Sequence, residues 1–122
     1  MGTRDLTILS LQHSDITIAS SIRFPAHLPD FKGHFPTAPI LPGVSQIDYV
    51  MQLATKYLPI SGDFSQIDKL KFQLPLSPEK TIKLSIHWLP EQQALTFIYT
   101  SDAGVHSSGR ILLSNAFIQP KK

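Results

Sequence analysis

The sequence contains no cysteine, which excludes disulfide bonds and metal sites built from thiolates. The absence of cysteine fits a reducing compartment, and we expect a cytoplasmic protein. Charged residues make up only 16% of the chain and the net charge is +2, which is too small to predict binding to nucleic acid. No apolar run approaches the ~20 residues of a membrane span. Residues 1–11 lack the basic region and long apolar run of a signal peptide.

The chain does have enough apolar side chains for one folded domain. Its 122 residues are 42% apolar, and a domain of this size buries roughly two thirds of its unfolded surface. We therefore expect a single domain over residues 1–122. Within it, residues 1–12 could be peripheral, and residues 119–122 form a frayed tail.

Alternation of apolar and polar residues predicts several β-strands. The inward rows are Ile16, Ile18, Ile22 and Phe24; Leu70, Phe72 and Leu74; Ile82, Leu84, Ile86 and Trp88; and Leu95, Phe97 and Tyr99. Residues 6–11 could be a further strand or a leader. A long last strand over residues 105–118 contains Gly109, which could mark a bulge or a close approach of the backbone.

Residues 33–52 predict an irregular loop that leads into a helix. Pro42 suits the position just before a helix, because proline lacks the N–H group and its φ is preset. From residue 44 to residue 58 the apolar residues recur at helical spacing, and Pro59 and Gly62 end the pattern. One long helix and a run of antiparallel strands predict an α+β domain with the sheet wrapped around the helix.

This loop and helix also bring together groups that can do chemistry. His34 lies in the loop and Asp48 in the second turn of the helix. Gly43 marks the helix N-terminus, where unpaired N–H groups favour developing negative charge. Gln52 follows Asp48 by one turn, so the two side chains can touch. A base, an acid and an anion hole are therefore encoded within twenty residues.

The motif resembles that of the FabA/FabZ-type 3-hydroxyacyl-acyl-carrier-protein dehydratases. Its parts are Gly-His-Phe-Pro, then Pro-Ile-Leu-Pro-Gly-Val, an acidic residue fourteen after the histidine, and a glutamine four later. The similarity runs over about residues 16–118 and includes the Ile-Asp-Lys-Leu-Lys-Phe run that precedes Pro75. The Ser-Gln-Ile-Asp-Tyr run, with Asp48 at the acidic position, is most similar to the ApeI-like dehydratases of aryl polyene biosynthesis.

The resemblance implies a hotdog fold and a hydro-lyase that acts in fatty-acid or aryl-polyene-type chain elongation. The implied substrate is a 3-hydroxyacyl thioester on the phosphopantetheine arm of an acyl carrier protein, and no cofactor is implied. Hotdog domains pair as dimers, and in this family the histidine and the acidic residue of one site come from different protomers. A homodimer is therefore expected, with a heterodimer or a higher oligomer as alternatives.

Each site residue has an expected role. His34, with an ordinary histidine pKa of ~6.5, is the base that takes the C2 proton. The Gly43 N–H stabilises the thioester oxygen, and Gln52 supports Asp48. Asp48 either protonates the leaving hydroxyl, which needs a pKa raised by about three units, or stays ionised and positions it. Phe35, Tyr49 and Phe72 are candidates for the lining of an acyl tunnel.

Each of these interpretations has a structural alternative. Gly43 could be a plain helix cap, and Asp48 a buried carboxylate that Gln52 satisfies. Tyr49 and Phe72, like Trp88, could be core residues. The lysines at 69, 71 and 83 are most simply the solvated face of strands, with docking of a carrier protein as the alternative. The remaining histidines show no ligand-like pattern, so no metal site is expected.

Two other functions stay open from the sequence. A hotdog thioesterase would also use a carboxylate on the helix but has no obvious need for His34. A non-catalytic acyl-binding or partner subunit would need neither group.

Overall fold

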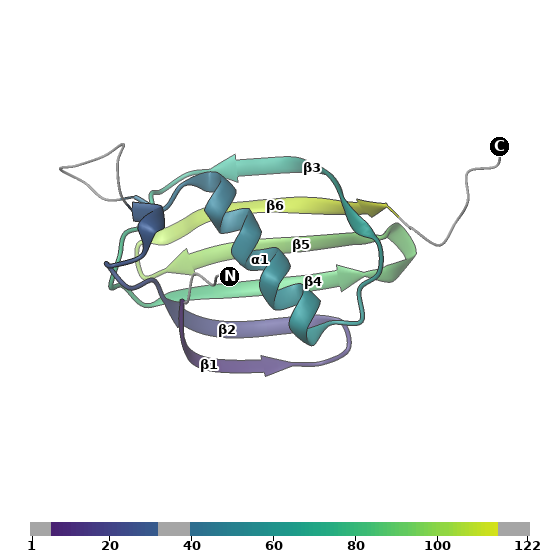
Figure 1. The fold of residues 1–122 in the computed structure, drawn as a ribbon, viewed down its shortest axis with the longest axis horizontal. Helices are drawn as coiled ribbons and strands as arrows, with labels where there is room; N and C mark the ends of the chain where they lie inside the picture. The colour runs from purple at the N-terminus through teal and green to yellow at the C-terminus, as the bar shows by residue number, and fades with distance from the viewer. Residues whose placement is uncertain (1–5, 32–39, 115–122) are drawn as a thin grey trace.

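The structure is a computed structural model that describes residues 6–31 and 40–114. One long helix, α1 (Gly43–Tyr57), lies across one face of a six-stranded antiparallel sheet (Figure 1). The strands are β1 (Thr7–His13), β2 (Thr17–Arg23), β3 (Asp63–Phe72), β4 (Ile82–Leu89), β5 (Ala94–Ser101) and β6 (Gly104–Ser114), and their spatial order is β1-β2-β4-β5-β6-β3. Two short 3₁₀ helices, η1 (Pro29–Phe31) and η2 (Pro90–Gln92), complete the described elements. The predicted α+β arrangement is confirmed.

Helix α1 begins and ends within one residue of the prediction. Pro42 is the N-cap residue, with an extended backbone (φ −61°, ψ 152°), and Gly43 is the first helical residue. The interpretation of Gly43 as the cap itself is therefore wrong. At the other end the N–H of Leu58 donates to the carbonyl of Ala54 at 2.9 Å, and Pro59 follows. None of the helices in the described part of the chain has the length and apolar character that a membrane crossing requires.

The core lies between α1 and the sheet and consists mainly of the predicted inward rows. In β4 buried and exposed residues alternate without a break from Ile82 to Trp88, and Leu95, Phe97 and Tyr99 of β5 are buried. Of the run over residues 6–11, residues 7–11 belong to β1, as the strand interpretation predicts. The prediction for Ile16 was wrong. The chain turns at residues 14–17, where Ser14 N–H donates to the carbonyl of Thr17, and this leaves Ile16 44% exposed before the strand starts.

Gly109 of β6 lies at a point where strand β3 is irregular. The pairing of β3 with β6 shifts between Asp68 and Lys71, and Lys69 has a left-handed φ of 55°. A side chain at Gly109 would begin only 3.0 Å from the ring of Phe97. The close approach expected at this glycine is therefore confirmed, whereas the bulge lies opposite it on β3 and not at Gly109 itself.

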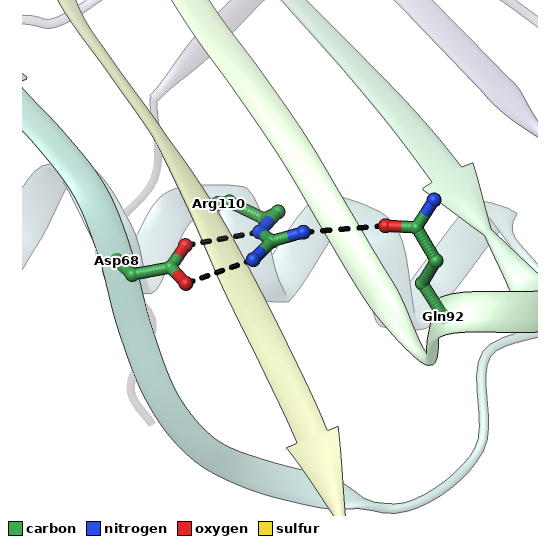
Figure 2. Close-up of polar contacts among 3 residues, drawn as sticks. All are labelled: Asp68, Gln92 and Arg110. Carbon is green, nitrogen blue, oxygen red and sulfur yellow. Dashed lines mark hydrogen bonds and ion pairs between the residues drawn. The ribbon is translucent and has the colours of Figure 1, made fainter.

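On the face of the sheet away from α1, an ion pair links β3 to β6 (Figure 2). Arg110 donates from Nε and Nη2 to the two carboxylate oxygens of Asp68, at 3.0 and 2.9 Å, and from Nη1 to Oε1 of Gln92 at 3.2 Å. The hydrogen bonds from Arg110 lower the pKa of Asp68, and the same pair raises the pKa of Arg110. The lysines at 69, 71 and 83 are exposed, as a solvated face predicts.

Candidate active site

The start of α1 opens onto a groove, which we call the α1 groove. Figure 1 shows that this end of the helix lies near β3, one of the two edge strands of the sheet. The groove has a volume of about 500 Å³ and is lined by Ile40, Leu41, Pro42, Gly43, Gln46, Phe72, Gln73, Leu74 and Pro75. The first N–H groups of a helix have no acceptor within the helix, and they carry the positive end of its dipole. The α1 groove is therefore suited to an oxygen atom that gains negative charge.

Gly43 and Phe72 meet in this groove. A Cβ atom added to Gly43 would lie 2.5 Å from Cζ of the Phe72 ring, which is closer than two carbon atoms approach. The absence of a side chain at Gly43 is thus what lets the ring approach the helix start. Phe72 is 51% exposed, so the interpretation of this residue as core is wrong for the single chain. Its position in the groove agrees with the alternative, contact with an apolar substrate.

Asp48 and Gln52 form the predicted pair one turn apart on α1. Nε2 of Gln52 donates to Oδ2 of Asp48 at 3.1 Å. Asp48 is partly buried and Gln52 is exposed. The hydrogen bond orients the carboxyl group, and Asp48 lies five residues, or ~7.5 Å of helix rise, beyond Gly43. Within the described residues neither of the two lines the α1 groove.

The other predicted site residues are placed as follows. His34 and Phe35 lie outside the described residues, so their roles stay predictions. Tyr49 is 1% exposed and its ring packs on that of Phe24, with 5.2 Å between centroids. Of the two interpretations of Tyr49, packing supports the core position, as it does for Trp88, which is 4% exposed.

Sequence reasoning gave no weight to Gln46, a polar residue on the buried face of α1. Its side chain is 3% exposed and bonds to the loop before the helix and to β6. Its backbone carbonyl accepts a hydrogen bond from Tyr99 Oη at 2.7 Å. Burial raises the pKa of Tyr99 well above its ordinary value, and the nearby Tyr49 adds to this effect, so the phenol stays a donor. A glutamine among the apolar residues that face the sheet was the available signal.

Metal binding has no support from the described part of the chain. Within residues 6–31 and 40–114 no three His, Asp or Glu side chains are grouped so that they could hold an ion. The α1 groove itself offers hydrogen bonding at the helix start beside an apolar wall.

Comparison with known proteins places this geometry in a family. The family model described as ApeI-like, ApeI dehydratase, matches residues 10–110. The chain belongs to the ApeI-like dehydratase family. The resemblance to FabA/FabZ-type dehydratases, and among them to the ApeI-like ones, is therefore confirmed.

Solved structures agree with the ApeI-like assignment. The dehydratase heterocomplex ApeI:P from Xenorhabdus doucetiae is 36% identical with a TM-score of 0.85, over 91% of this chain and 99% of that one. An uncharacterised protein from Erwinia carotovora subsp. atroseptica is 34% identical with a TM-score of 0.79, over 93% and 98%. The expected hotdog fold is confirmed by these neighbours.

Curated relatives of this ApeI-like chain are FabZ enzymes. The 3-hydroxyacyl-[acyl-carrier-protein] dehydratase FabZ of Haemophilus influenzae is 36% identical over 76 residues, which are 56% of this chain and 51% of that protein. That of Colwellia psychrerythraea is 35% identical over 80 residues. The chain thus spans about half the length of the curated relatives it matches.

Proposed function

We propose that this chain removes water from a 3-hydroxyacyl thioester and yields the trans-2-enoyl thioester. The observation that carries the proposal is the α1 groove, in which the helix start at Gly43 faces the apolar ring of Phe72. The Asp48–Gln52 pair lies on the same helix. Membership of a dehydratase family gives this arrangement its reaction class.

In the proposed reaction His34 accepts the C2 proton of the substrate. Negative charge then develops on the thioester oxygen, which the Gly43 N–H stabilises; one such donor is typically worth ~3 kcal/mol. The C3–O bond breaks, and the hydroxyl group, held by Asp48, takes up a proton and leaves as water. If His34 returns the proton it removed, both residues end the cycle in their starting states.

We further propose that the thioester is carried by the phosphopantetheine arm of an acyl carrier protein. The names of the FabZ relatives support this choice, and the exposed lysines at 69, 71 and 83 offer positive charge on the same sheet. A place in fatty-acid or aryl-polyene-type elongation is part of the same proposal. Carriage by coenzyme A is the alternative that a substrate comparison distinguishes.

The site is proposed to be completed by a second chain that pairs with β3. Among the described strands β3 has a single neighbour, β6, and three large apolar side chains near this edge, Phe64, Phe72 and Leu74, are at least 37% exposed. A second copy, or a related dehydratase subunit, would cover them. In this proposal His34 of the second chain acts together with Asp48 of the first. The ApeI:P heterocomplex shows that a solved neighbour pairs with another chain.

The test is turnover of carrier-bound 3-hydroxyacyl substrates of varied chain length, followed by mass spectrometry for the loss of one water. His34→Ala should lower kcat by about 10²- to 10⁴-fold, as expected for the loss of a general base, and Asp48→Asn should also lower it strongly. His87→Ala, which removes an exposed histidine of β4, is the matched control and should keep wild-type turnover. Normal turnover by His34→Ala would refute the proposal.

The same assay separates the two alternatives. A hotdog thioesterase would release free thiol from the acyl thioester and leave the 3-hydroxyl group in place. A non-catalytic partner subunit would bind the acyl carrier without turnover. Either result with the wild-type chain would replace the dehydratase proposal.

A further inference from the structure

The side chain of Gln46 joins two segments of the protein beside the α1 groove. Its side-chain Nε2 donates to the carbonyl of Leu41 at 3.1 Å, and its Oε1 accepts from Oγ of Ser107 at 2.6 Å. Gln46 is 3% exposed and Ser107 is fully buried. One buried amide therefore connects the loop before α1 to strand β6.

The backbone of Gln46 is fixed as well. Its N–H donates to the carbonyl of Pro42 at 3.1 Å, and its carbonyl accepts from Tyr99 Oη of β5 at 2.7 Å. Just before the helix, the N–H of Leu41 donates to the carbonyl of Leu76 at 2.8 Å, which ties this part of the chain to the segment after β3. Gly43 lies between these fixed points, so the direction of its N–H depends on them.

We propose that Gln46, held by Ser107, is a positioning residue that sets the Gly43 N–H toward the substrate oxygen. This inference rests on the dehydration proposed for the α1 groove and goes beyond it by naming what keeps the donor in place. A donor stabilises an oxyanion only when it lies about 2.7–3.1 Å from it. A misplacement of the order of 1 Å can lower the rate about 100-fold.

The chemistry of the contact favours positioning over simple packing. A buried amide is costly unless its polar atoms are bonded, and an apolar side chain of similar length would fill the same volume without that cost. The amide bonds instead to two groups of fixed direction, a backbone carbonyl and a serine hydroxyl. Hydrogen bonds of this kind set angles and distances, which apolar contacts do not.

Two variants and one control test the proposal. Ser107→Ala removes the hydroxyl that orients Gln46, and Gln46→Met replaces the amide with an apolar chain of similar length. Ser20→Ala is the control: Ser20 is also buried, and its Oγ donates to the carbonyl of Leu84 at 2.9 Å, between β2 and β4. The Ser20→Ala variant therefore also loses one buried serine hydrogen bond, but in the part of the sheet near the β1 edge.

We expect Ser107→Ala and Gln46→Met to lower kcat about 10- to 100-fold with KM nearly unchanged. Ser20→Ala should lose as much thermal stability as Ser107→Ala but keep its kcat. If Gln46→Met does not fold, Ser107→Ala alone decides. Equal kcat values for Ser107→Ala and Ser20→Ala, in an active wild-type background, would show that Gln46 is merely structural and would overturn the inference.

A second measurement does not depend on activity. The ¹⁵N chemical shift and the hydrogen-exchange rate of the Gly43 amide should change in Ser107→Ala and stay as in the wild type in Ser20→Ala. If the wild-type chain has no dehydratase activity, the proposed function fails while this measurement still tests the positioning. An unchanged Gly43 amide in Ser107→Ala would overturn the inference in that case too.

Discussion

Asp48 and Gln46 show how neighbouring polar residues of one helix can have different tasks. Asp48 is partly buried and bonds to Gln52 one turn later on the same helix. Gln46 lies against the sheet and bonds to Ser107, 61 residues away. The first arrangement leaves the Asp48 carboxyl group partly accessible to solvent. The second fixes the start of the helix from inside the protein.

The Asp68–Arg110 ion pair should make stability depend on pH in a defined direction. Because Arg110 lowers the pKa of Asp68 in the folded state, the folded state binds a proton at this group less readily than the unfolded chain does. The stabilisation is therefore complete above the unfolded pKa of ~3.9 and is lost as the pH falls through the lower folded value.

We expect Asp68→Asn to be less stable than the wild type by a constant amount above about pH 5. This difference should shrink as the pH falls below about 4. Urea unfolding of both proteins across this range measures it. Asp102→Asn, in the turn between β5 and β6, corrects for the loss of one negative charge at the surface. A difference that grows on acidification would contradict the role of the ion pair.

At the scale of elements, the start of α1 and the end of β3 act together. The ring of Phe72 rests where a side chain at Gly43 would begin. Because this ring is 51% exposed, it can move aside for an added methyl group without disturbing the core. The contact therefore concerns the shape of the α1 groove more than the stability of the fold.

Gly43→Ala should change the free energy of unfolding by less than about 1 kcal/mol, because the gain in helix propensity offsets the displaced ring. It should lower kcat/KM about 10-fold or more, since the α1 groove is altered at the proposed donor. In a Phe72→Ala background the same change should cost less activity. Val44→Ala, at the adjacent and 76% exposed position, is the control. An equal loss of activity in both backgrounds would show that the ring contact is not the cause.

At the scale of the whole molecule, the two edges of the sheet differ in what they offer a partner. Beside the β3 edge lie the exposed aromatic residues Phe64 and Phe72 and the α1 groove, whereas β1 exposes Ile8 and Leu9 far from that groove. An edge strand with exposed apolar side chains favours pairing with another chain, and replacement of one of those apolar side chains by lysine opposes it. We therefore expect assembly through β3.

Phe64→Lys should lower the mass measured by light scattering from that of a paired assembly to that of a single chain. It should also lower turnover, because the proposed site needs groups from both chains. Leu9→Lys, a matched change at a residue that is 45% exposed on β1, should alter neither property. An unchanged mass for Phe64→Lys, or dissociation by Leu9→Lys alone, would contradict assembly through β3.

Features that depend on local chemistry could be predicted from the order of the amino acids alone. Pro42 and Pro59 set the ends of α1 because proline restricts the backbone where it stands. Alternation set the inward rows of β4 and β5 because successive strand residues point to opposite faces. The Asp48–Gln52 contact followed from helical spacing in the same way.

Features that depend on residues far apart in the chain could not be predicted in this way, because they arise from packing. The strand order β1-β2-β4-β5-β6-β3 leaves β3 at an edge, and this position is why Phe72 is exposed although its alternation predicts burial. The bonds from Tyr99 and Ser107 to Gln46 span 53 and 61 residues, a separation at which no local pattern carries information. The preference of a segment for helix or strand depends on a residue and its neighbours in sequence. Which distant groups come into contact depends on how α1 packs on the sheet.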